Sequence, residues 1–379
     1  MKVAETEDED INLEELEDCN VCDETTIKQI FNLRCEAVTS KTINKNKYVL
    51  YLDGTLKSTP NIIVGLSDNM VEVYNFSNNQ LAKLETFELS ENVVGVRSCR
   101  ENENIFYIGS RNCQIEIIDL RDSKSRSYLK DTTIEAPSNY KPLNCFDISS
   151  NNLLLCGGTD LYGGDAYILF WDIRKTNLLG AYWESHTDDI TQVMFHPEDP
   201  NKLISGSTDG LINLYDLSNA TEDDAFLDSL NSESSVEQIS WFIEDNKDAI
   251  GCVTHTSDMQ IWKLEDVQPY AHFHKEEIAK ELKRKLEDYC YIASIQVNKH
   301  NSLIALVGSN YGNGECLRSF GVNRKNLLPL FDVKGNKQRV RCSWLNKNDD
   351  ILVTGGENGS IDIWNVETNF GTNNKRKKI

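Results

Sequence analysis

The residue types that most often do chemistry in proteins occur here without a recognisable pattern. Cys19 and Cys22 have the spacing of half a zinc site, but a tetrahedral zinc site needs four ligands, and we find no second Cys-x-x-Cys or paired His to complete it. Among the six histidines, His186 is better explained by a structural hydrogen bond, and His196, which precedes Pro197, by a turn at the end of a strand. We therefore expect neither a bound metal nor a cofactor.

Nucleophiles and glycine-rich loops also lack the sequence context that catalysis needs. No local arrangement of Ser, His and Asp supports a catalytic triad. The segments GSTDG and GGENG are typical of connections between strands, because tight turns need glycine and aspartate, and neither leads into a helix as a phosphate-binding loop does. The sequence therefore predicts a protein without enzymatic activity.

The elements around these residues form a repeat. Two clear copies, LISGSTDGLINLYDLS at 203–218 and LVTGGENGSIDIWNVE at 352–367, contain an apolar strand, a turn and an alternating strand that ends in an aromatic residue. With five weaker copies, the marker residues at the end of the alternating strand are Tyr74, Ile118, Trp171, Tyr215, Trp262, Phe320 and Trp364. Consecutive markers are 44 to 58 residues apart, near or above the roughly 40 to 45 residues of a four-stranded propeller blade. The repeat predicts an all-β fold with seven blades.

The pairs Trp171-Asp172 and Ser185-His186 resemble WD repeats, and the resemblance covers about residues 27–368. It implies a seven-bladed WD-repeat β-propeller, which we place at 26–368, with a buried hydrogen-bonded set of His, Ser or Thr, Asp and Trp in a blade. The matching residues of the fourth repeat are His186, Ser205, Asp209 and Tyr215, with Tyr215 in the place of Trp. Those of the seventh are Thr354, Asn358 and Trp364, with Asn336 in the place of His. Because these sets are imperfect, we expect the blades to depend mainly on apolar packing.

The last repeat needs a strand from elsewhere in the chain. It has used its third strand by Trp364, and the polar and basic residues 365–379 are poor strand formers. The segment IKQIFNLRCEAV at 27–38 contains β-branched and aromatic residues, so we expect it to pair with the seventh blade and close the ring.

A second segment departs from the strand pattern. In HKEEIAKELKRKLEDYC at 274–290, Ile278, Leu282 and Leu286 recur every four residues among charged side chains. This spacing predicts an amphipathic helix inserted between the fifth and sixth blades. Such a helix either caps a blade edge or docks a partner.

Charge and composition limit the class of protein. The formal net charge is -21, and residues 1–25 hold eleven acidic side chains against Lys2 alone. We expect an acidic, disordered tail at 1–25 and a basic tail at 369–379, and no nucleic-acid binding by the acidic body. We expect no membrane association, because the apolar runs are too short for a span and the N-terminus is unlike a signal peptide. The eleven cysteines are scattered, which is typical of reduced thiols.

Two motifs suggest partners or a location. One motif is Trp171-Asp172-Ile173-Arg174, and a related motif in the preceding repeat contains Asp119 and Arg121. Both resemble the Trp-Asp-x-Arg box through which some WD-repeat proteins dock on the adaptor of a cullin-RING ubiquitin ligase. Asp after the marker residue is also ordinary in a repeat. The second motif is a basic run near the end of the chain, Lys375, Arg376, Lys377 and Lys378. It is either a nuclear-import signal or a solvated basic end without a specific role.

These features predict a non-enzymatic protein-interaction scaffold, because the loops of a propeller form wide, rigid faces. We expect it in the nucleus rather than the cytoplasm, as a monomer or as part of a larger complex. One alternative is a substrate receptor that docks on the ubiquitin-ligase adaptor. Another is a nuclear assembly factor or chaperone whose acidic tail shields a basic client.

Overall fold

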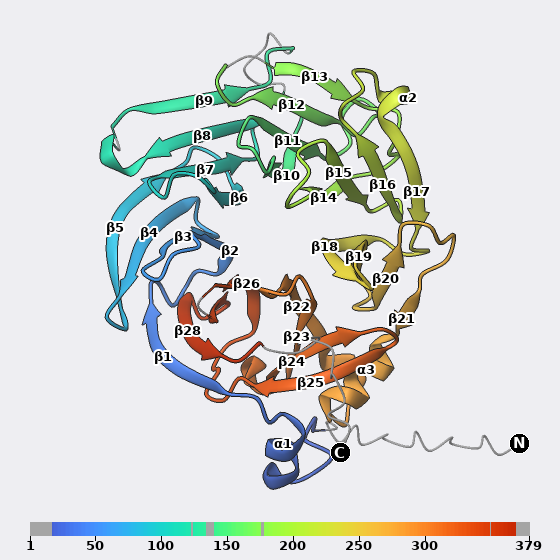
Figure 1. The fold of residues 1–379 in the computed structure, drawn as a ribbon. Helices are drawn as coiled ribbons and strands as arrows, with labels where there is room; N and C mark the ends of the chain where they lie inside the picture. The colour runs from blue at the N-terminus through green and yellow to red at the C-terminus, as the bar shows by residue number, and fades with distance from the viewer. Residues whose placement is uncertain (1–16, 123, 134–139, 176–177, 349, 369–379) are drawn as a thin grey trace, which may run out of the picture.

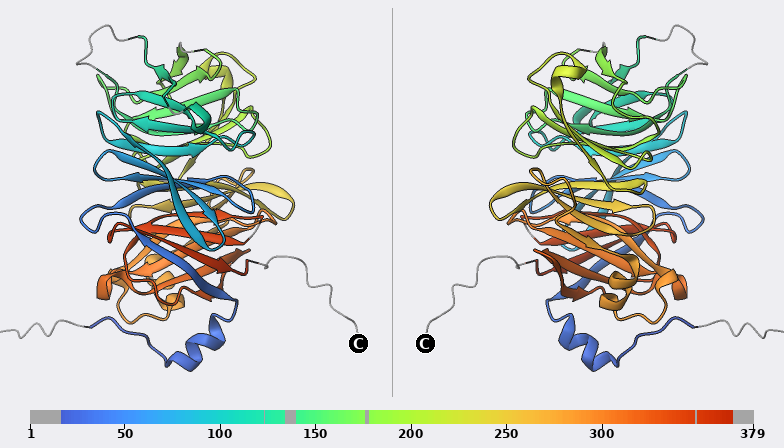
Figure 2. Two further views of the ribbon diagram at one scale, coloured as in Figure 1. Left: turned by 90° about the vertical axis from the view of Figure 1, so that its left-hand side faces the viewer. Right: turned by 90° about the vertical axis from the view of Figure 1, so that its right-hand side faces the viewer.

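Seven four-stranded antiparallel sheets form a ring around a central channel (Figure 1). The computed structural model describes residues 17–122, 124–133, 140–175, 178–348 and 350–368. Each sheet is one blade, with its first strand at the channel and its last strand at the perimeter, and Figure 2 shows the ring from the side. The fold is the predicted seven-bladed β-propeller.

The first four blades follow the order of the chain from channel to perimeter. Blade 1 contains β2 (Val49–Gly54), β3 (Asn61–Leu66), β4 (Met70–Ser77) and β5 (Gln80–Glu88). Blade 2 contains β6 (Val93–Ser98), β7 (Ile105–Ser110), β8 (Gln114–Asp119) and β9 (Arg126–Lys130). Blade 3 contains β10 (Leu143–Ile148), β11 (Leu154–Thr159), β12 (Ile168–Asp172) and β13 (Leu178–Tyr182). Blade 4 contains β14 (Ile190–Phe195), β15 (Lys202–Ser207), β16 (Leu211–Asp216) and β17 (Phe226–Asn231).

The last three blades include the point where the ring closes. Blade 5 contains β18 (Val236–Glu244), β19 (Lys247–Thr254), β20 (Met259–Lys263) and β21 (Ala271–Phe273). Blade 6 contains β22 (Cys290–Val297), β23 (Leu303–Ser309), β24 (Leu317–Asn323) and β25 (Asn326–Asp332). Blade 7 contains β26 (Val340–Asn346), β27 (Ile351–Gly356), β28 (Ser360–Val366) and, as its outer strand, β1 (Cys35–Thr42) from the other end of the chain.

The marker residues occupy the same position in every blade. Each lies on the third strand and is buried, and Ile118, Trp171, Trp262 and Phe320 have no exposed surface. Burial of a large apolar side chain at this point stabilises a blade by about 1.5–3 kcal/mol. The residues that recur along the sequence therefore occupy the same buried position, on the third strand, in all seven sheets.

The strand that completes blade 7 begins later than the sequence predicts. Strand β1 pairs antiparallel with β28, from Cys35 opposite Val366 to Thr42 opposite Ser360. Most of the predicted strand 27–38 lies before it. The first part is instead helix α1 (Glu24–Ile30), because the Asp23 carboxylate accepts the Thr26 backbone N–H at 2.7 Å and caps the helix.

Residues 17–25 are folded, although the sequence prediction places them in a disordered tail. The Asp18 carboxylate is buried and accepts hydrogen bonds from Arg284 Nε at 2.7 Å, Ser309 Oγ at 2.6 Å and the Leu286 backbone N–H at 3.0 Å. Burial opposes ionisation of Asp18, but these hydrogen bonds hold its pKa below the ordinary value. The acidic residues 1–16 and the basic tail 369–379 lie outside the described residues.

The helix predicted at 274–290 is shorter than its apolar spacing suggests. Helix α3 (Lys275–Leu282) buries Ile278 and Leu282, but Lys283 adopts a left-handed conformation with φ 62° and ends the helix before Leu286. The apolar face therefore packs against blades 5 and 6. The remaining short elements are α2 (Glu222–Ala225), η1 (Leu120–Asp122), η2 (Glu287–Tyr289) and η3 (Tyr311–Gly314).

We predict that Asp18→Asn destabilises the propeller at neutral pH. The substitution leaves the buried Arg284 guanidinium without its counter-charge, which costs about 3 kcal/mol when one partner of a buried pair is lost. Because the pKa of Asp18 is lowered by folding, the stabilisation is present above the ordinary carboxylate pKa and is lost as the pH falls through the folded value. Denaturant unfolding of both proteins measures the difference.

The matched control is Asp23→Asn. Asparagine caps a helix about as well as aspartate, and Asp23 lies on the surface, so this variant should unfold within about 0.5 kcal/mol of the wild type. Equal stabilities for the Asp18 and Asp23 variants would show that residues 17–22 do not contribute to the folded body.

Candidate functional site

The buried set expected in the fourth repeat is present. His186 Nδ1 lies 2.9 Å from Asp209 Oδ2, and His186 Nε2 lies 2.6 Å from Ser205 Oγ. Ser205 Oγ also lies 3.3 Å from the Tyr215 hydroxyl, so tyrosine joins the set at the position where tryptophan is usual. Burial raises the pKa of Tyr215 to about 12, which keeps its hydroxyl protonated. These residues hold the blade together and leave no reactive group at the surface.

The corresponding set in the seventh repeat is divided. Trp364 Nε1 donates to Thr354 Oγ1 at 3.0 Å, while the Asn358 side-chain amide donates to the Lys337 carbonyl. Asn336 does not substitute for histidine, because its amide donates to the Gly314 and Gln338 carbonyls. The prediction of one connected set with Asn336 and Asn358 is therefore wrong.

Gln338 supplies the connection in blade 7. Its amide donates to Asp362 Oδ2 at 2.7 Å and to the Ser360 carbonyl, and its oxygen accepts the Asn358 backbone N–H. Gln338 was not predicted, because it lies two residues after Asn336, which occupies the usual position of histidine.

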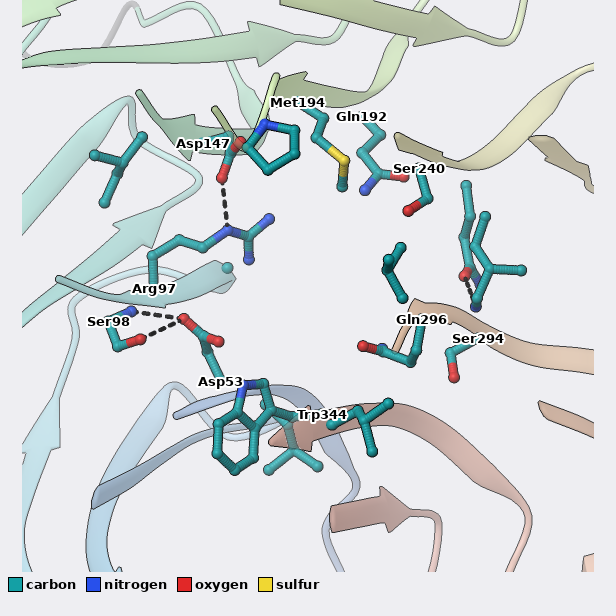
Figure 3. Close-up of a pocket in the computed structure, with 18 of the residues that line it drawn as sticks. Asp53, Arg97, Ser98, Asp147, Gln192, Met194, Ser240, Ser294, Gln296 and Trp344 are labelled. Atoms are coloured by element: carbon teal, nitrogen blue, oxygen red, sulfur yellow. Dashed lines mark hydrogen bonds and ion pairs between the residues drawn. The ribbon is translucent and has the colours of Figure 1, made fainter. Parts of the chain in front are cut away.

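The central channel has a volume of about 880 Å³ and is bordered by the inner strands of all seven blades. Side chains on these strands reach across to the next blade and form an inner-strand belt, whose members are Asp53, Arg97, Asp147, Gln192, Gln238, Gln296 and Cys342. Figure 3 shows several of them facing the channel. The belt was not predicted, because the sequence of an alternating strand does not show which group of the next blade a polar side chain will contact.

The belt connects each blade to the next by a side-chain contact, and at four of the seven junctions the contact is of one kind. Asp53, Asp147, Gln192 and Gln238 accept backbone N–H groups of Ser98, Phe195, Ile239 and Ile295 respectively, at 2.6, 2.9, 2.7 and 3.3 Å. Gln296 donates to the Ser343 carbonyl at 3.0 Å, and Cys342 Sγ lies 3.5 Å from the Val49 carbonyl across the closure. The polar groups of the belt therefore hold neighbouring blades together.

Arg97 joins the second and third blades through charge. Its Nε donates to Asp147 Oδ1 at 3.1 Å (Figure 3). Burial lowers the pKa of Arg97, but the carboxylates of Asp147 and Asp53 more than offset this and raise it. Burial raises the pKa of Asp53, and Arg97 opposes that shift.

The candidate adaptor-docking residues lie at equivalent positions of neighbouring blades, where β8 and β12 end. Each arginine forms an ion pair within its own motif, Arg121 with Asp119 at 2.6 Å and Arg174 with Asp172 at 2.8 Å. Hydrogen bonds from Arg174 lower the pKa of Asp172 to about 2. Trp171 is buried and donates to the Lys130 carbonyl, and Asp172 is buried as well. Of the predicted set, the two arginines and, in part, Asp119 therefore face solvent.

Four exposed apolar side chains come from the outer parts of the neighbouring blades 3 and 4, and we name them together the blade 3/4 surface. Its members are Leu179, Trp183, Phe226 and Leu227, with 56, 46, 38 and 58% of their surface exposed. Figure 1 shows their strands, β13 and β17, at the perimeter of adjacent blades. The sequence did not indicate this surface, because its residues come from two repeats.

Glu222 fixes the position of Trp183. Its carboxylate accepts the backbone N–H groups of Trp183 at 2.7 Å and Glu184 at 3.0 Å, and it also accepts the Ser185 hydroxyl. Glu222 begins helix α2, which leads directly into Phe226. One carboxylate thus holds the exposed tryptophan beside the strand that carries the other apolar side chains.

All eleven cysteines are free thiols. Burial raises the pKa of Cys113, Cys145 and Cys252 to about 12, so these thiols stay protonated. Cys19 is exposed and Cys22 is half-buried beside α1. None of the helices in the described part of the chain has the length and apolar character that crossing a bilayer requires.

The predicted import residues Lys375, Arg376, Lys377 and Lys378 lie outside the described residues.

Comparison with known proteins agrees with this architecture. The family model "WD domain, G-beta repeat" matches residues 178–216 and 328–365, which contain the two clearest repeats. The order of the variant repeats also resembles WD repeat-containing protein 89. A homolog of that protein from Dictyostelium discoideum is 26% identical over 82% of this chain and 81% of its own length.

Two further relatives extend the likeness. An uncharacterized WD repeat-containing protein of Schizosaccharomyces pombe is 24% identical over 79% of this chain and 93% of its own length. The WD repeat-containing protein GTS1 of Arabidopsis thaliana is 41% identical over 26% of this chain and 25% of its own length. With seven four-stranded blades, buried markers in every blade and two matched repeats, the chain is a seven-bladed β-propeller that contains WD repeats.

Proposed function

We propose that this protein is a non-catalytic scaffold that binds other proteins, and that the blade 3/4 surface is one of its docking sites. The observation that supports this most is the exposed Trp183, which Glu222 holds in place among other exposed apolar side chains. Water hydrates the apolar surface of an exposed tryptophan unfavourably, and aromatic anchors contribute much of the binding energy at protein interfaces. Because Glu222 fixes the backbone at Trp183, little backbone conformational entropy is lost there on binding.

The inner-strand belt supports the same assignment. Its polar groups are paired with the neighbouring blade, so they contribute to the rigidity of the ring. A rigid ring presents the loops and outer strands of seven blades in fixed relative positions. Such a framework suits a protein whose activity is binding.

We predict that Trp183→Ser together with Leu227→Ser removes specific neighbours of the tagged full-length protein in cells. Loss of a central aromatic anchor costs 2 kcal/mol or more, which lowers affinity about 30-fold. Proximity labelling followed by quantitative mass spectrometry compares the neighbours of the variant and the wild type.

The matched control is Leu84→Ser together with Val267→Ser, which removes two exposed apolar side chains from blades 1 and 5. The control should keep the neighbours that the Trp183 variant loses. If the two variants and the wild type label the same proteins to the same extent, the blade 3/4 surface is not a docking site.

A second candidate function is that of a substrate receptor for a cullin-RING ubiquitin ligase. It is supported by the exposure of Arg121 and Arg174, whose side chains are 63 and 66% accessible at equivalent positions of adjacent blades. Each guanidinium is oriented by the aspartate of its own motif. The pair could then contact one adaptor surface together.

We predict that Arg121→Ala together with Arg174→Ala lowers recovery of the ligase adaptor in affinity purification at least about 10-fold, a loss of roughly 1.4 kcal/mol. Arg34→Ala together with Arg324→Ala removes two exposed arginines elsewhere and should leave recovery unchanged. Absence of the adaptor from the wild-type purification would end this proposal.

We further propose a nuclear location, which the basic residues 375–378 support. A fluorescent fusion of the full chain should accumulate in the nucleus, and deletion of those four residues should shift it to the cytoplasm. An unchanged nuclear signal after the deletion would contradict an import role for them.

A further inference from the structure

Three potential metal ligands meet at one edge of blade 5. Asp258 ends the turn between β19 and β20, His272 lies on the outer strand β21, and His274 directly precedes helix α3. Pairing of β20 with β21 places Gln260 opposite His272 and so brings the turn to the histidines. The two histidines are separated by the buried Phe273, so they project to the same, outer side of the strand.

The distances between these side chains fit a bound ion better than a hydrogen bond. Asp258 Oδ2 lies 3.3 Å from His272 Nε2 and 3.3 Å from His274 Nδ1. Hydrogen bonds of this type are usually about 2.9 Å long. Two ligands that each lie about 2.0–2.1 Å from a tetrahedral zinc ion are about 3.3–3.4 Å apart. The distances from Asp258 Oδ2 to the two histidine nitrogens therefore already match the spacing of ligands around a tetrahedral zinc ion.

The remaining contacts hold the ligands in this arrangement. Asp258 Oδ1 accepts the Lys275 backbone N–H at 2.9 Å, which orients the other carboxylate oxygen toward the histidines. The imidazole rings lie 3.9 Å apart with 43° between their planes. Two imidazoles that face the same carboxylate at this distance would repel each other if both were protonated, whereas neutral imidazoles can share one cation.

The local charges are compatible with a cation. The positive N-terminus of α3 is offset by Glu276 and Glu277 in its first turn. The Lys275 ammonium is engaged with the Asp288 carbonyl at 3.1 Å. The side chains of Asp258, His272 and His274 are 21, 32 and 56% exposed, so an ion can enter from solvent.

We propose that Asp258, His272 and His274 bind a zinc ion, with water as the fourth ligand. Two imidazole nitrogens and one carboxylate oxygen form a donor set that suits zinc among the divalent metals. The ion joins the turn before β20 to the end of β21. That strand has three residues, fewer than any other outer strand of the described propeller. The ion therefore acts as a clip that holds the outer edge of blade 5 and the start of α3 in place.

The proposed site departs from the expectation that the protein binds no metal. His272 and His274 lie far from Cys19 and Cys22 in the chain, so the sequence pattern did not indicate the site. The third ligand, Asp258, precedes His272 by fourteen residues and joins it only through strand pairing.

Zinc binding to the full-length protein, treated first with a chelator and then dialysed, tests the proposal. In isothermal titration with zinc chloride, the wild type should bind one ion at this site. His272→Gln together with His274→Gln should lower that affinity at least about 100-fold. Zinc should also raise the Tm of the wild type and leave the Tm of the double variant unchanged.

Two controls separate this site from other ligands in the chain. Cys19→Ser together with Cys22→Ser tests the cysteine pair, and His300→Ala removes an exposed histidine elsewhere. Both variants should retain the affinity of the wild type. Cobalt titration of the wild type provides a measurement without mutation, because a tetrahedral site with nitrogen and oxygen ligands gives intense visible absorption bands.

Three results would overturn the proposal. They are the absence of zinc binding by the wild type, equal zinc affinity of the wild type and the double histidine variant, and loss of binding in the cysteine variant alone. If the double histidine variant does not fold, a cobalt spectrum of the wild type without tetrahedral bands would reject the site by itself.

Discussion

The structure depends on holding seven separate sheets in a closed ring. No backbone ladder joins one blade to the next, so the inner strands need other contacts, and the inner-strand belt supplies them. The belt uses carboxylates and amides that accept or donate at the backbone of the following blade. At the closure, β1 completes blade 7, and the two ends of the propeller become parts of one sheet. An outer edge that would otherwise remain unpaired is thereby covered.

Ring closure also explains why this chain tolerates departures from its family pattern. Blade 4 has the full hydrogen-bonded arrangement of His186, Ser205 and Asp209, whereas blade 7 uses Gln338 instead. Each buried network contributes stability, but the apolar cores between blades and the belt act at every junction. The turns and outer strands are consequently free to diverge, and the proposed docking and zinc sites both lie there.

The sequence predicted most of the architecture, because each blade is a local pattern. The markers from Tyr74 to Trp364 all lie on third strands and are buried. Predictions near the N-terminus were less accurate. Acidic composition suggested disorder through residue 25, but Asp18 pairs with Arg284, which follows α3, and the Asp23 cap turns part of the expected strand into α1. These outcomes depend on partners more than 250 residues away or on one capping hydrogen bond.

The sequence by itself determined the number of blades and the likeness to WD repeats, because strand alternation and turn chemistry act over a few residues. Tertiary structure decided which polar groups meet. Gln192 reaches Ile239, Glu222 holds Trp183, and Asp258 meets His272 only after the blades have formed. The candidate sites could not be read from the sequence, since each combines residues that are neighbours in space and whose own sequence surroundings are those of ordinary strands and turns.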